Sequence, residues 1–136
     1  MKLSRRDLAG LFPLVAAAQS RPTLPSKVYR HSAVAYKGNE QKKGRQFFRG
    51  GNRSGFDLEM HETILAPGTE THAPHKHAHE EIVIVVEGTV ETYLEGNKEL
   101  AEAGSVAYFG SNQMHSARNA GKTPCRYYVI ELRGDE

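Results

Sequence analysis

The chain has 136 residues, of which 38% are hydrophobic, so it is long enough to form one globular domain with its own core. The formal net charge is +2, and the whole excess lies in residues 1–18, so the rest of the chain is formally neutral. A neutral domain without a run of basic residues gives no support to nucleic-acid binding. The single cysteine, Cys125, cannot form an internal disulfide, and we expect it to be a small buried hydrophobe.

The first 18 residues have the layout of an export signal. The basic pair Arg5-Arg6 is followed by the apolar stretch 8–18. This stretch is shorter than the roughly 20 residues that cross a bilayer, so we expect no stable membrane insertion. The arginine pair resembles the twin-arginine (Tat) signal, and a general secretion signal is the alternative. We therefore expect a Tat-like signal peptide at residues 1–18, a flexible lead-in at 19–26, and a periplasmic or secreted mature protein.

From residue 27 onward, short β-forming runs alternate with turn residues, and no long helical pattern is present. A polar stretch at 37–44 is expected to be a loop. In the run 56–65, alternation places Glu59 and His61 on one face, which we interpret as facing solvent or supporting a nearby site. Many short strands at even spacing favour an all-β sandwich or barrel. The strands are expected at 28–35, 45–48, 56–65, 82–86, 89–94, 98–101, 106–109, 114–118 and 125–132.

Four side chains have the chemistry and the spacing of a metal site. His75 and His77 are two residues apart just before the strongly β-forming run 82–86, so in an extended segment both imidazoles point to the same face. Glu81 follows His77 at an even offset, and only folding can bring the distant His115 to them. Three imidazoles and a carboxylate suit one divalent transition metal ion, namely manganese, iron, nickel, cobalt, copper or zinc.

Glu80 and His79 are the alternative candidates for the carboxylate ligand and for an imidazole ligand, respectively. Glu80 is adjacent to Glu81, and in a strand the two must point to opposite faces. Because Glu81 lies an even number of positions after His77, it is favoured as the ligand, and Glu80 is expected to point toward solvent or a subunit interface. His79 is interpreted as a surface or supporting residue, and His72 as a loop residue at the mouth of the site.

The intervals around these residues resemble the two sequence motifs of the cupin family. The chain departs from the second motif at Gly110, where proline is usual, and at Asn112, where glycine is usual, although both residue types tolerate turns. The resemblance covers residues 65–132 and implies a single cupin (jelly-roll-type) β-barrel of antiparallel strands over residues 27–136. The first motif is matched by Gly68, His75, His77, Glu81 and Gly88, and the second by Gly104, His115 and Asn119.

The resemblance implies a centre of three histidines and one glutamate with open coordination positions. We expect a metal-dependent oxygenase or isomerase/lyase that acts on a small molecule, and the alternative is a non-enzymatic extracytoplasmic module that binds a metal or a sugar. No catalytic residue is assigned, because Tyr93 and Tyr108 are more typical of packing than of acid–base chemistry. The predicted partners are a small-molecule ligand or substrate and, as an alternative to a monomer, a second copy of the chain in a homodimer. Residues expected to line the barrel are Val83, Val85, Tyr93, Tyr108, Phe109 and Tyr128.

Overall fold

The structure is a computed structural model, and it describes residues 23–134. This part of the chain contains one 3₁₀ helix, η1 at His31–Ala33, and no α-helix. Within it, no helix has the length and apolar character needed to cross a membrane. The expected signal peptide lies outside the described residues. The strands are β1 Lys37–Gly38, β2 Lys42–Gly51, β3 Asp57–Leu65, β4 Glu80–Glu87, β5 Thr89–Leu94, β6 Asn97–Glu102, β7 Val106–Phe109, β8 His115–Asn119 and β9 Cys125–Arg133.

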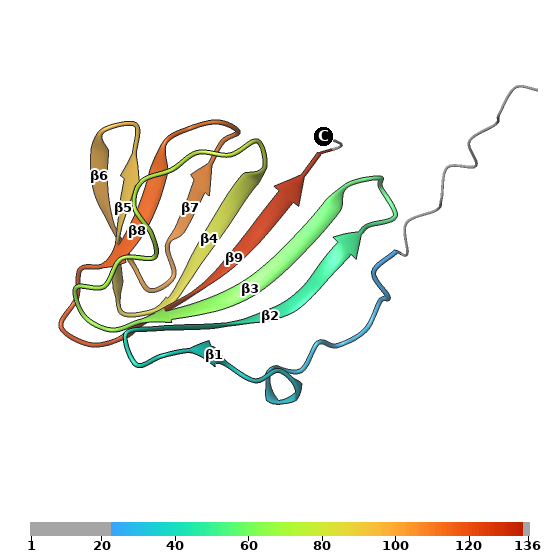
Figure 1. Ribbon diagram of the computed structural model, residues 1–136, viewed down its shortest axis with the longest axis horizontal. Coiled ribbons are helices and arrows are strands. Elements are labelled where there is room, and N and C mark those ends of the chain that lie inside the picture. Colours follow the sequence, from blue (N-terminus) through green and yellow to red (C-terminus); the bar gives the residue numbers. More distant parts are fainter. Residues whose placement is uncertain (1–22, 135–136) are drawn as a thin grey trace, which may run out of the picture.

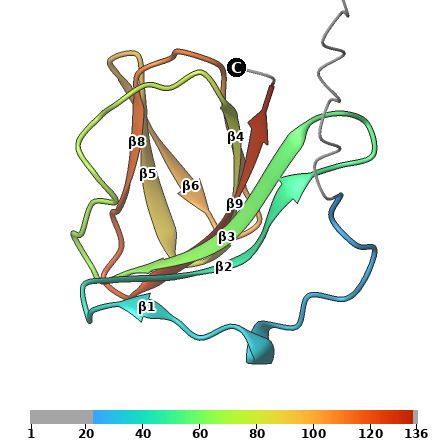
Figure 2. The same cartoon turned by 45° about the vertical axis from the view of Figure 1, so that its right-hand side comes forward.

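The strands form two antiparallel sheets that face each other (Figures 1 and 2). The larger sheet has the order β1-β2-β3-β9-β4-β7, and the smaller one has the order β6-β5-β8. Apolar side chains from both sheets meet between them, among them Leu65, Val85, Val90 and Tyr127, each at most 2% exposed. This arrangement confirms the all-β, antiparallel jelly-roll fold that the sequence predicts.

Gly88 allows the chain to leave one sheet and enter the other. It lies between β4 of the larger sheet and β5 of the smaller sheet, with a φ of 78°. A Cβ atom at this position would lie 2.9 Å from the Cα of Cys125. Only glycine adopts this φ without strain and also avoids this close contact. The structure therefore explains why the first motif ends in a glycine.

The outer face of the larger sheet carries a buried ionic network around Glu62, whose side chain is fully buried. Its carboxylate accepts hydrogen bonds from the Tyr36 hydroxyl at 3.0 Å, from Nη1 of Arg126 at 3.1 Å, and from Nε of Arg45. Burial by itself raises the pKa of Glu62, but these hydrogen bonds outweigh it and lower the pKa below its usual value. Arg45 also donates to the carbonyl of His31 at 2.9 Å, so the network fixes the N-terminal segment against the sheet.

That segment differs from the sequence prediction. The strand expected at 28–35 is wrong, because residues 31–33 form η1 and the segment lies against the outer face of the sheet. There the ring of Tyr29 packs against Phe48 with their centroids 4.9 Å apart. The polar loop expected at 37–44 is also wrong in part, because Lys37 of β1 pairs with Gly44 of β2.

Candidate metal centre

His75 and His115 are held together by their backbones. His75 lies in the segment between β3 and β4, which runs beside β8 (Figure 1), and His115 is the first residue of β8. The amide of each residue donates to the carbonyl of the other, at 3.0 and 2.8 Å. This isolated antiparallel bridge explains how two histidines 40 positions apart reach one site.

His77 is positioned by the turn where the chain departs from the second motif. Asn112 has a φ of 59°, in the left-handed region that asparagine tolerates better than most residues. Its amide donates to the carbonyl of His77 at 2.7 Å. The asparagine thus replaces the usual glycine and preserves the turn, as the sequence predicts.

The imidazoles of His77 and His115 present Nε2 lone pairs that accept no hydrogen bond from the described chain. Nδ1 of His77 and Nδ1 of His115 each contact a backbone carbonyl at 2.8 Å, those of His79 and Gln113. A carbonyl only accepts, so Nδ1 carries the hydrogen and Nε2 keeps its lone pair. Within residues 23–134, both Nε2 atoms and Nδ1 of His75 are buried without a hydrogen-bond partner. Unpaired buried polar atoms are uncommon, and these three histidines place ligand atoms within 4.8 Å of one another, which fits a cation.

The carboxylate of Glu81 completes the cluster. Its Oε1 lies 3.1 Å from Nε2 of His77, and its Oε2 lies 3.4 Å from Nε2 of His115. Two ligand atoms each about 2.1 Å from one ion are separated by about 3.0–3.4 Å at octahedral to tetrahedral angles. These spacings of His77, His115 and Glu81 fit one divalent ion, and His75 places a ligand atom within 4.8 Å of those of His77 and His115, while ligation itself stays a prediction.

The surroundings of His75 favour its neutral imidazole. Burial, and then the neighbouring histidines His72, His115 and His77, lower the pKa of His75. The ring of Phe109 stacks on His115 with their centroids 4.6 Å apart. Because a metal binds the neutral form of histidine, a lowered pKa prepares the nitrogen for ligation near neutral pH.

The register of the larger sheet decides which glutamate faces the site. Glu81 of β4 is opposite Glu131 of β9, which is opposite Glu59 of β3, so three carboxylates form a row across the inner face. Glu80 points to the other face, where its hydrogen bond to Tyr108 raises the pKa of that tyrosine. The placement of Glu81 and Glu80 agrees with the parity prediction.

We predict that Glu81→Gln weakens binding of a divalent ion by more than about tenfold, because the site loses its anionic ligand. Glu80→Gln should change the binding free energy by less than about 0.5 kcal/mol, as surface substitutions do for stability. A titration of the metal-free protein with Mn²⁺ or Zn²⁺ measures both variants. The reverse ranking would contradict the assignment of Glu81.

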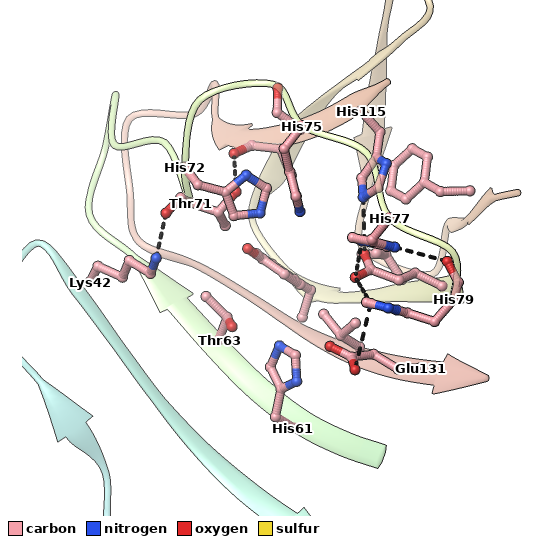
Figure 3. Close-up of a pocket in the computed structure, with 17 residues that line it drawn as sticks. Lys42, His61, Thr63, Thr71, His72, His75, His77, His79, His115 and Glu131 are labelled. Atoms are coloured by element: carbon pink, nitrogen blue, oxygen red, sulfur yellow. Dashed lines mark hydrogen bonds and ion pairs between the residues drawn. The ribbon is translucent and has the colours of Figure 1, made fainter. Parts of the chain in front are cut away.

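The cluster forms one end of a pocket of about 280 Å³ between the two sheets. Figure 3 shows His75, His77 and His115 at one side, and His61, Thr63 and Lys42 at the other. Of the residues expected to line the barrel, Val83 and Phe109 face this pocket. Tyr128 does not, since it packs against Phe47 on the outer face, and Tyr127 takes its place.

Among the charged residues and histidines of the pocket, Lys42 and Glu131 were not predicted as part of it, and His61 and His79 were predicted only as solvent-facing or supporting residues. His79 stacks face to face on His77, with centroids 3.4 Å apart, and its Nε2 lies 3.6 Å from the Glu131 carboxylate. His77, His79 and Glu81 also form a group whose ligand atoms lie within 4.8 Å of one another. The sequence signal for His79 and His61 was their even spacing from His77 and Glu59, respectively.

Comparison with known families adds to this geometry. A family described as "Cupin domain" matches residues 61–131, slightly more than half of the chain. The chain belongs to the cupin family. The matched region of this cupin contains all four predicted ligands. A search of curated proteins found no match.

Solved structures show the same fold at low identity. KdgF from a Halomonas species has a TM-score of 0.68 and 19% identity, and the match covers 80% of this chain and 96% of that one. A cupin described as RmlC-like, from Shewanella frigidimarina, has a TM-score of 0.64 and 18% identity, with coverages of 79% and 90%. The polyketide cyclase RemF from Streptomyces resistomycificus has a TM-score of 0.62 and 18% identity, with coverages of 81% and 85%. At these identities the likeness supports the fold alone.

Proposed function

We propose that this cupin is a metal-dependent enzyme that binds one divalent ion through His75, His77, Glu81 and His115 and acts on a small molecule. The observation that carries the proposal is that His75, His77 and His115 place ligand atoms within 4.8 Å of one another, and that Nε2 of His77 and Nε2 of His115, unpaired within the described chain, meet the Glu81 carboxylate. An ion bound there would polarise an oxygen of the substrate or, if it is redox-active, bind dioxygen. The pocket volume of about 280 Å³ suits a substrate with few heavy atoms.

The pocket supports an enzyme better than a simple binding module. A module that only holds a metal or a sugar needs no titratable groups beyond the ligands. Here His61, His79 and Glu131 also line the cavity. RemF is described as a polyketide cyclase, so that protein is an enzyme with this fold. Both the oxygenase and the isomerase/lyase classes are consistent with the ligand set.

Elemental analysis of the purified protein tests the proposal, and one transition metal ion per chain is expected. Oxygen uptake with a panel of phenols and diketones, compared with product formation under nitrogen, then separates an oxygenase from an isomerase or lyase. A protein that binds none of the six metals after dialysis at neutral pH would contradict the proposal. A homodimer, which light scattering would detect, stays a prediction.

We also propose that the protein is exported through the Tat route, on the basis of the pair Arg5-Arg6 before the apolar stretch 8–18. The double variant Arg5→Lys, Arg6→Lys keeps the charge and should abolish extracytoplasmic accumulation, because Tat recognition depends on the arginines themselves. Fractionation with immunodetection measures the distribution. If the double variant accumulates outside the cytoplasm like the parent, general secretion replaces the Tat proposal.

A further inference from the structure

His61 faces the pocket from β3, on the side opposite the predicted ligands, and it pairs with Glu59 of the same strand. Nδ1 of His61 lies 2.8 and 3.2 Å from the two carboxylate oxygens of Glu59. Glu59 is only 5% exposed, and Nε2 of Gln46 donates to its Oε1 at 3.1 Å. Because Nδ1 must carry a hydrogen to meet an ionised carboxylate, Nε2 of His61 is left as the atom available to a substrate.

The position of His61 relative to the metal centre follows from the register. His61 is opposite Val129 on β9, which is opposite Val83 on β4, two residues from Glu81. Two strand spacings amount to about 10 Å between backbones, and the side chains of His61, labelled in Figure 3, and of Glu81 line the same pocket. A small molecule that contacts the centre with an oxygen can therefore present a neighbouring carbon to His61.

The electrostatic surroundings keep this histidine able to hold a proton. Burial alone lowers the pKa of His61, but the hydrogen bond to Glu59 and the negative charges nearby outweigh it and raise the pKa. The side chain is 30% exposed, so protons can exchange with water through the pocket. The charged and titratable groups around it are Glu59 on β3, Glu131 and Arg133 on β9, Glu81 on β4, Lys42 on β2 and His79 in the loop before β4.

A second metal site is the competing interpretation, since Glu59, His61 and Glu131 place ligand atoms within 4.8 Å of one another. Their other contacts argue against it. Glu59 already accepts from Gln46, and Glu131 accepts from Nε of Arg133 at 2.9 Å. The arginine supplies the positive charge that Glu131 needs and would repel a divalent ion.

We propose that His61, positioned by Glu59, is the catalytic base and acid of an isomerase reaction on a carbonyl compound. This inference rests on the proposed metal-dependent function. Nε2 of His61 takes a proton from the carbon next to the carbonyl, and the C–H electron pair becomes the C=C bond of an enolate. The imidazolium then returns the proton to a carbon atom, so the step needs no oxidant or reductant. Lys42 in the same pocket favours substrates that also carry a carboxylate.

Deuterium exchange tests the step directly. The metal-loaded protein is incubated in D₂O with pyruvate, or with hydroxyacetone as an uncharged probe, and loss of the C–H signal is followed by ¹H NMR. His61→Asn should slow the exchange by at least about 100-fold, the lower end of what general base catalysis contributes. Glu59→Gln should slow it by about tenfold and move the rising limb of the pH–rate profile to lower pH. His31→Asn, which changes an exposed histidine outside the pocket, is the matched control and should leave the rate unchanged.

Two further readouts separate this inference from the proposed function. Metal content should stay at one ion per chain in the His61 and Glu59 variants, whereas a second ion that is lost in them would overturn the proposal in favour of a second metal site. An NMR titration of the metal-free protein should show a lower pKa for His61 in Glu59→Gln than in the parent. If the metal-loaded parent exchanges neither probe, or if His61→Asn exchanges them as fast as the parent, the catalytic role of His61 is wrong while the metal centre stands.

Discussion

Replacing His75, His77 or His115 with alanine is expected to lower the affinity for a divalent ion by more than about 100-fold. Changes to groups that merely support a metal ligand already cost 10–100-fold, and these variants remove a ligand itself. The barrel should remain folded, because its stability comes mainly from apolar residues between the sheets, such as Leu65 and Val90. Isothermal titration with Zn²⁺ or Mn²⁺ measures the affinity, and circular dichroism measures the fold.

His72→Ala is the matched control for this series. His72 lines the same pocket and its ring lies 3.9 Å from that of His75, but it is exposed and belongs to none of the groups within residues 23–134 that could hold an ion. Its removal should change the affinity by less than about threefold. Full occupancy in His77→Ala, or an equal loss in all four variants, would contradict the ligand assignment.

The second large effect is expected at Glu62, on the face of the larger sheet that points away from the pocket. Glu62→Ala should lower the free energy of unfolding by about 3–5 kcal/mol, because it leaves Arg45 and Arg126 without the carboxylate that they share. The control is Glu87→Ala, which removes an exposed partner of Arg126 and should cost less than about 1 kcal/mol. Urea denaturation measures both variants. Equal losses in the two variants would show that the buried network does not stabilise the fold.

The lowered pKa of Glu62 gives this network a pH dependence with a definite sign. The folded protein binds the proton less readily than the unfolded chain, whose glutamates titrate near about pH 4.3. The stabilisation is therefore complete above that pH and is lost as the pH falls through the lower pKa of the folded state. Glu62→Gln should flatten the decrease in stability below about pH 4, and an unchanged slope would contradict this account.

The four ligands were predicted from the sequence. The structure explains why the even spacing between His77 and Glu81 was sufficient to place Glu81 on the face of the site. The segment between His77 and Glu81 bends at residues 78 and 79, so it is not the extended run that the parity argument assumes. Glu81 reaches the site because pairing of β4 with β9 fixes its face. Periodicity predicted the correct face for Glu81 here, although the physical cause is the register of the sheet.

The same periodicity was insufficient for Glu59 and His61. Alternation correctly placed them on one face of β3, but a polar face is usually a solvated one in an antiparallel sheet. Only the tertiary arrangement shows that the smaller sheet stands opposite and turns this face into a pocket wall. The strand prediction at 28–35 was wrong for a related reason. β-forming side chains such as Tyr29 pack against the sheet, although this segment is not a strand of it.

The predicted ligands come from both halves of the fold, since Glu81 belongs to the larger sheet and His115 to the smaller one. An ion bound by both would act as a removable cross-link between the sheets. Metal occupancy and the separation of the two sheets are then a single linked equilibrium, in which tighter binding means a more closed molecule. A chelator would therefore remove the ion needed for the reaction, and it would also remove the cross-link between the sheets that sets the width of the pocket.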